Sequence, residues 1–258
     1  MRMYLAVLFF ITALLYACVG FGGGSTYNAL LVLAETDYRI IPILALTCNI
    51  IVVSGGVWHF SKTKHIKLSQ VFPWIILSIP AAWLGGYMTV PETVFVGILG
   101  CALLLSGIKM LLPEKEIFFL QPQTHFAWAK SSFVPPIVGA SLGFLAGITG
   151  IGGGIFLAPV LHLLRWGDSK NIAGTCSLFI LVNSLSGLAG QGMKLENTGL
   201  LISTVGAYWY LFPAVLVGGQ IGSWMGSSRI NVNAVKKLTA LLILYVSIRL
   251  LYQFVTNI

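Results

Sequence analysis

Charged residues are scarce in this sequence. Only 9% of its 258 residues are Asp, Glu, Lys or Arg, whereas a soluble domain carries roughly 25%. Hydrophobic residues account for 57%, and the mean hydropathy is +0.91. Because a helix that spans the bilayer needs about 20 apolar residues, the chain has room for about eight to ten membrane segments and for no separate soluble domain.

Several other signals are missing. The apolar stretches are continuous and do not alternate with polar residues, which excludes a membrane barrel and favours an all-α polytopic membrane protein. There is no HExxH, GxSxG or P-loop, and the glycine runs lack the third glycine of GxGxxG. The four cysteines lack the spacing of a metal site or a disulfide framework. We therefore expect neither an enzyme nor a metal or cofactor.

Acidic residues are absent from the interior of the apolar segments. Proton-coupled pumps usually carry chains of intramembrane Asp, Glu or His, and the sequence contains no such relay. A pore without carboxylates suits a small anionic substrate, while coupling to H⁺ or Na⁺ remains open. The seven acidic residues lie in loops or at segment ends: Glu35, Asp37, Glu92, Glu114, Glu116, Asp168 and Glu196.

The formal net charge of +8 comes from Lys and Arg in short loops between apolar runs. The positive-inside rule for membrane proteins accounts for this pattern. We therefore expect the partner of this basic chain to be the lipid bilayer and not nucleic acid.

The two halves of the chain resemble each other. FGGGS at 21–25 matches IGGGI at 151–155, and TCN at 47–49 matches TCS at 175–177. IPAAWLGG at 79–86 resembles FPAVLVGG at 212–219, and SGIKMLL at 106–112 resembles SIRLLY at 247–252. Four matches in the same order predict a duplication, with membrane repeats at 1–112 and 132–258 joined by a polar cytoplasmic linker at 113–131.

Each half contains five apolar segments. The second of each half follows a glycine triplet and, at 1.5 Å per residue, covers roughly 15 Å, about half of the hydrocarbon thickness. We interpret the first two segments of each half as a glycine-broken helix pair, either a re-entrant hairpin or two crossings, followed by three spanning helices. The segments are expected at about 3–20, 25–34, 40–60, 69–89 and 93–112, and at about 133–149, 155–164, 171–190, 199–225 and 234–255.

The basic residues predict the topology. If the first two segments of each half return to the same side, eleven basic residues face one side and four the other, whereas a glycine run inside a single span gives nine and six. The positive-inside rule favours the first arrangement, which puts both termini outside and makes the halves inverted repeats. The eleven are Lys62, Lys64, Lys67, Lys109, Lys115, Lys130, Arg165, Lys170, Arg229, Lys236 and Lys237, and the four are Arg2, Arg39, Lys194 and Arg249.

The paired glycine triplets are candidate anion sites near the midplane. A helix that begins just after a glycine turn points its unpaired N–H groups and its positive dipole end at the break. Polar residues inside nearby apolar segments add donors. The alternative is that Gly, Ser and Thr only allow close helix packing. The predicted substrate-binding residues are Gly22, Gly23, Gly24, Ser25, Thr26, Asn28, Thr47, Asn49, Thr149, Gly152, Gly153, Gly154, Thr175, Ser177 and Asn183.

Two cations occupy matching positions near opposite faces. Lys109 and Arg249 are candidates for attracting anions to the two mouths of the pathway. The alternative is that both side chains snorkel to the nearest interface, because each lies within two turns of its segment end.

Four motifs resemble the TauE/SafE family of sulfite and sulfonate transporters: GFGGGS at 20–25, GITGIGGGIFLAPVL at 147–161, AGTCSL at 173–178 and FPAVLVGGQIGSWMG at 212–226. The second half matches better, because the first lacks a counterpart of Pro159. The resemblance implies a permease for a small sulfur-containing anion, sulfite or an organosulfonate, in the bacterial cytoplasmic membrane. An anion channel is the nearest alternative, and a non-transport membrane subunit or enzyme is a further one. The sequence leaves the direction of transport and the oligomeric state undetermined.

Overall fold

The computed structural model describes residues 2–18, 20–111, 133–164, 166–167, 169–198, 206–225 and 232–256, so the predicted linker lies outside the described residues. Every regular element within these ranges is an α-helix, as the continuous apolar runs predict. The first half comprises α1 (Arg2–Ala17), α2 (Gly24–Leu33), α3 (Ile41–Lys62), α4 (Leu68–Ile75), α5 (Ser78–Tyr87) and α6 (Glu92–Leu111). The second comprises α8 (Val134–Thr149), α9 (Gly154–Leu163), α10 (Ser169–Thr198), α12 (Leu211–Met225) and α13 (Val232–Thr256).

Two helices differ from the predicted segments. The segment expected at 69–89 is divided into α4 and α5 by a turn at Ile76 and Leu77. Pro80 explains the interruption, because its nitrogen has no hydrogen to donate to the carbonyl of Ile76 four residues earlier. The segment expected at 199–225 begins in residues outside the described part, and its helix α12 starts at Leu211.

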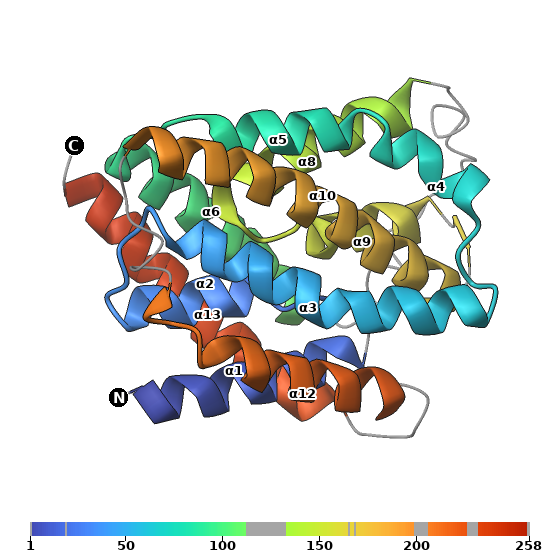
Figure 1. The fold of residues 1–258 in the computed structure, drawn as a ribbon, viewed down its shortest axis with the longest axis horizontal. Coiled ribbons are helices and arrows are strands. Elements are labelled where there is room, and N and C mark those ends of the chain that lie inside the picture. Colours follow the sequence, from blue (N-terminus) through green and yellow to red (C-terminus); the bar gives the residue numbers. More distant parts are fainter. Residues whose placement is uncertain are drawn as a thin grey trace.

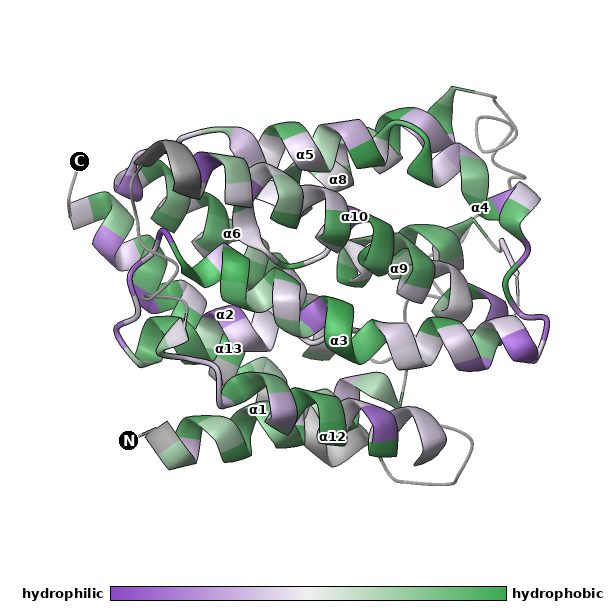
Figure 2. Ribbon diagram, in the orientation of Figure 1, coloured by the Kyte–Doolittle hydropathy of each residue, from purple (hydrophilic) through white to green (hydrophobic). Residues whose placement is uncertain are grey.

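Three stretches of the described chain are long and apolar enough to cross a membrane: Ile41–Lys62, Leu68–Tyr87 and Lys170–Lys194. Five shorter apolar helices accompany them, in α1, α6, α8, α12 and α13. Figure 2 shows hydrophobic residues along the lengths of the helices and hydrophilic residues mainly in the connections at their ends. This distribution is that of a protein whose helix sides face an apolar medium.

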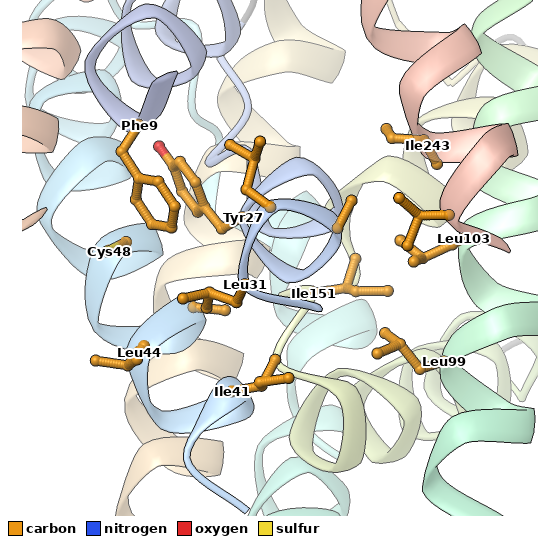
Figure 3. Close-up of a cluster of buried hydrophobic side chains, with 14 of the residues drawn as sticks. Phe9, Tyr27, Leu31, Ile41, Leu44, Cys48, Leu99, Leu103, Ile151 and Ile243 are labelled. Atoms are coloured by element: carbon orange, nitrogen blue, oxygen red, sulfur yellow. The ribbon is translucent and has the colours of Figure 1, made fainter. Parts of the chain in front are cut away.

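The short helix α2 lies in the middle of the molecule. Its first eight residues are all buried. Figure 3 shows it surrounded by Phe9 of α1, Leu44 of α3, Leu99 of α6 and Ile243 of α13. A helix that is enclosed on every side contacts protein and not lipid, so its polar residues must find partners inside the fold.

The chain reverses at the first glycine break, and α2 returns along α1. The rings of Phe9 and Tyr27 stack with their centroids 4.7 Å apart, and a Cβ on Gly23 would lie 3.0 Å from Cγ2 of Thr12. The second break behaves similarly, since Gly153 lies beside the Leu142 carbonyl of α8. Each glycine run therefore joins a longer helix to a ten-residue helix that folds back toward it.

The helices pair across the two halves. Helix α1 packs on α12, and its counterpart α8 packs on α5. In addition, α6 packs on α13, and α3 packs on α10. Glycines allow close approach at two of these contacts: Gly143 faces the backbone of Ser78, and Gly222 faces the backbone of Leu14. Helix α1 begins and α13 ends at the same end of the molecule (Figure 1).

Candidate functional site

The two glycine breaks share an unusual backbone conformation. Gly20 and Gly150 have φ of 79° and 77°, and Gly23 and Gly153 have φ of 90° and 76°. Residues with a side chain rarely adopt this left-handed conformation, and glycine adopts it freely. Each pair is 130 residues apart, so the sequence match of the triplets extends to their backbone. The match is incomplete, because Gly152 has φ of 82° and Gly22 has no positive φ.

The side chain of Asn49 brings the two breaks together. Its Nδ2 donates a hydrogen bond of 3.2 Å to the carbonyl of Gly150, and the residue is fully buried. A Cβ on Gly24 would lie 2.6 Å from this nitrogen, and one on Gly152 would lie 2.9 Å from it. A Cβ on Gly22 would meet the Oδ1 of the same amide. Three of the six predicted glycines, two from the first half and one from the second, therefore lie around one amide.

A second amide binds the end of α8. The Nδ2 of Asn28, on α2, donates a hydrogen bond of 2.6 Å to the carbonyl of Thr149. Together with Asn49, it satisfies two successive carbonyls at the second break with donors from the first half. These two carbonyl oxygens therefore already accept hydrogen bonds from side-chain amides.

The reverse connection runs from α10 to the first break. The Oγ of Ser177 donates to the carbonyl of Gly20 at 2.6 Å, with the carbonyl of Ala173 a second acceptor at 2.9 Å. Ser177 and Asn49 occupy matching positions in TCS and TCN, and Gly20 and Gly150 match as well. Each half therefore binds the equivalent carbonyl of the other half's glycine break.

The helix starts at both breaks keep free backbone donors. Among the described residues, no hydrogen bond uses the N–H groups of Gly24 and Ser25 in α2, or those of Gly154 and Ile155 in α9. These groups belong to the first turn, where an α-helix has no internal acceptor for them. In each helix, the positive end of the dipole lies at these N–H groups and faces the adjacent glycine break.

Several buried polar side-chain atoms around the breaks lack a hydrogen-bond partner. Ser184 was not predicted from the sequence, yet it is fully buried and its Oγ would lie 3.3 Å from a Cβ on Gly152. The polar run NSLSG at 183–187 was the signal that could have indicated it. The unpartnered atoms in this part of the fold are Oδ1 of Asn28, Asn49 and Asn183, Oγ1 of Thr175 and Oγ of Ser184. Buried polar groups normally have partners, so these five atoms are candidates for contact with a bound molecule, and the three amide oxygens among them can only accept a hydrogen bond.

No charged side chain is buried in the part of the chain that the structure describes. The buried polar residues there are Ser, Thr, Asn and Gln. The site is therefore polar but electrically neutral apart from the helix dipoles.

The remaining predicted residues make other contacts. Thr47 is partly exposed, and its hydroxyl donates to the carbonyl of Ile43 in its own helix. Thr26 is buried on α2 and shares a hydrogen bond of 2.9 Å with the hydroxyl of Tyr16. Arg249 is exposed on α13, and the side chain of Lys109 lies outside the described part.

Comparison with known proteins gives a consistent assignment. The family model described as "Sulfite exporter TauE/SafE" matches residues 5–250. A protein of Sinorhizobium fredii named "Probable membrane transporter protein y4hK" is 33% identical over 251 residues, covering 96% of this chain and 97% of its own. No solved structure matches. The chain belongs to the TauE/SafE family of membrane transporters.

Proposed function

We propose that this protein is a secondary carrier that moves a small sulfur-containing anion, sulfite or an organosulfonate, across the bacterial cytoplasmic membrane. The observation that carries the proposal is the meeting of the two glycine breaks around Asn49, where α2 and α9 begin with unused N–H groups. Helix starts of this kind bind sulfate, phosphate and carboxylate groups. The family description, which names sulfite, supports the choice of anion.

The electrostatics of the breaks favour an anion over a cation. A cation would need carboxylates or free carbonyl oxygens as ligands. The carbonyls of Thr149 and Gly150 are instead bound by the amides of Asn28 and Asn49. The unused N–H groups of the helix starts remain as ligands and attract negative charge, whereas the unpartnered Oδ1 atoms of Asn28, Asn49 and Asn183 would suit a coupling cation such as Na⁺.

The two halves form inverted repeats in this proposal, and the glycine-broken pairs are re-entrant hairpins. Three observations support it: the matched φ angles of the breaks, the reciprocal bonds from Asn49 and Ser177, and the return of α2 along α1. The pairing of α1 with α12 and of α8 with α5 is the pattern expected when a two-fold axis exchanges the halves. Both termini then lie outside.

Burial of the site favours a carrier over a channel. Asn49, Asn183 and Ser184 are fully buried, and the glycines of both triplets are buried as well. An anion therefore reaches the site only when the helices around it move, which is the defining step of alternating access. Net export of a monovalent anion would be favoured by the interior-negative potential by about 2.3 kcal/mol per 100 mV.

Flux measurements in proteoliposomes test this function. Purified protein is reconstituted, a membrane potential is imposed, and the uptake of sulfite and of a short organosulfonate is followed. We expect potential-dependent flux that analogues inhibit and that Gly153→Val abolishes, because valine does not tolerate a φ of 76° and its Cβ would lie 3.0 Å from the Phe179 ring. The matched control is Gly192→Val, since nothing lies within 4 Å of a Cβ at that exposed position.

Four outcomes are informative. Saturable flux with counter-flow exchange supports a carrier, and non-saturable flux at channel rates supports the channel. No flux of any sulfur oxyanion by correctly folded protein would refute the proposed substrate class. Equal flux through the Gly153→Val and Gly192→Val variants would mean that the second glycine break is not part of the transport pathway.

A further inference from the structure

A cavity of about 260 Å³ lies beside the connections from α2 to α3 and from α5 to α6. Figure 1 places both connections at the end of the molecule where α1 begins and α13 ends. The volume is several times the roughly 30 Å³ that one water occupies in the liquid. The cavity therefore has room for a small oxyanion together with part of its hydration shell.

Both charged residues that line the cavity are cations, Arg39 and Lys194. The Nε of Arg39 lies 3.4 Å from Oδ1 of Asp37, and its guanidinium carbon lies 5.7 Å from the centroid of the Tyr38 ring. The guanidinium of arginine is a planar fork whose terminal nitrogens match the spacing of two oxyanion oxygens. Two cations in a cleft with apolar walls concentrate counter-ions there, although the Asp37 carboxylate beside Arg39 offsets part of this charge.

The inner wall of the cavity adjoins the second glycine break. Pro42 and Ile148 line the cavity, and a Cβ on Gly150 would lie only 2.7 Å from Cα of Pro42. Gln191 also lines it, is fully buried, and donates from Nε2 to the carbonyl of Gly147 at 2.9 Å. Its Oε1 has no hydrogen-bond partner. This oxygen can only accept a hydrogen bond, so Gln191 adds polarity to the inner wall and is not itself a ligand for an anion.

We propose that this cavity is an anion vestibule, in which Arg39 and Lys194 collect small oxyanions from the aqueous side and Gln191 marks the inner end of the path toward Gly150. The vestibule rests on the proposed function for its role in transport. Its capacity to concentrate anions is independent of which anion is carried. This independence allows the two proposals to be tested separately.

The first test measures the electrostatic potential of the cavity by chemical labelling. Thr89, an exposed residue of the lining, is replaced by Cys in protein whose Cys18 and Cys101 are Ala. The rates of modification by the anionic sulfonatoethyl and the cationic trimethylammonioethyl methanethiosulfonates are compared. We expect the ratio of the anionic to the cationic rate to fall about tenfold when Arg39→Gln and Lys194→Gln are combined.

The matched control is Lys170→Gln, which removes the same charge from the opposite end of the helix that carries Lys194. The two lysines are 24 positions apart, roughly 36 Å along a helix, so the labelling ratio should not change. The charge-conserving variants Arg39→Lys and Lys194→Arg should keep the ratio of the parent protein. A ratio that is the same in the Gln variants and the parent overturns the vestibule.

The second test measures sulfite flux at low ionic strength. The double Gln variant should raise KM about fivefold with little change in Vmax, and added salt should reduce the difference, because capture of the anion is affected and the buried site is not. An unchanged KM in protein whose parent transports sulfite overturns the vestibule alone. If the parent protein transports no anion, the proposed function fails, and the labelling ratio still decides whether the cavity attracts anions.

Discussion

Gly24→Ala adds one methyl group at the point where the two halves meet. The new Cβ would lie 2.6 Å from Nδ2 of Asn49 and 2.6 Å from the carbonyl oxygen of Ile151. Both distances are well below van der Waals contact, and the second neighbour is backbone of the opposite half, which yields less easily than the tip of a side chain. Since φ of Gly24 is not positive, the substitution has no backbone strain and its effect is purely one of packing.

The size of the effect follows from overpacking. Extra methylene groups in a well-packed core cost about 1–3 kcal/mol, and the gain in helix propensity from Gly to Ala offsets up to about 1 kcal/mol. We therefore expect a net loss of about 1–2 kcal/mol in the free energy of unfolding. For a chain of this size that corresponds to a fall of roughly 2–8 °C in Tm.

The assay is thermal unfolding in detergent, combined with anion flux in proteoliposomes. Gly192→Ala is the control, because it makes the same chemical change where nothing lies within 4 Å, and it should leave Tm unchanged or slightly raised. The Gly24 variant should also lose most of its flux, because the amide of Asn49 is displaced from Gly150. If Gly24→Ala has the Tm and the flux of the parent protein, the two breaks do not meet as described.

The remaining predictions concern the amide and the topology. Asn49→Ala leaves the buried carbonyl of Gly150 without its donor, a loss of about 1–3 kcal/mol, so flux should fall about tenfold or more. The control Ser54→Ala, on the exposed side of the same helix, should not change the flux. Equal flux in the two variants would contradict the role of the amide. Cysteines introduced at Met3 and Thr256, both exposed, should react with an impermeant maleimide added to intact cells. Labelling of either only after permeabilisation would refute the topology derived from the basic residues.

Helix positions were the most predictable part of the fold. The segments expected at 25–34 and 155–164 begin one residue from the observed starts of α2 and α9, because a glycine break is an unambiguous boundary in an apolar chain. The division of α4 from α5 was missed, although Pro80 was visible in the sequence. A continuous apolar run has no periodicity with which to locate an interruption inside it.

The sequence by itself determined that the chain is a helical membrane protein and that each half is interrupted at a glycine run. Composition decides the first, because so few charges and such long apolar runs suit only a bilayer. The chemistry of glycine decides the second, because Gly20, Gly23, Gly150 and Gly153 occupy conformations that other residues rarely adopt.

Only the tertiary structure decided which polar residues reach the breaks. Thr47 and Asn49 were equal candidates in one apolar run, yet two positions along a helix are about 200° apart, so they point to nearly opposite sides. In a helix that is apolar on every face, no sequence pattern tells which side is inward. The hydrogen bond from Asn49 to Gly150 joins residues 101 positions apart, and such a contact exists only once α3 has packed against the second half.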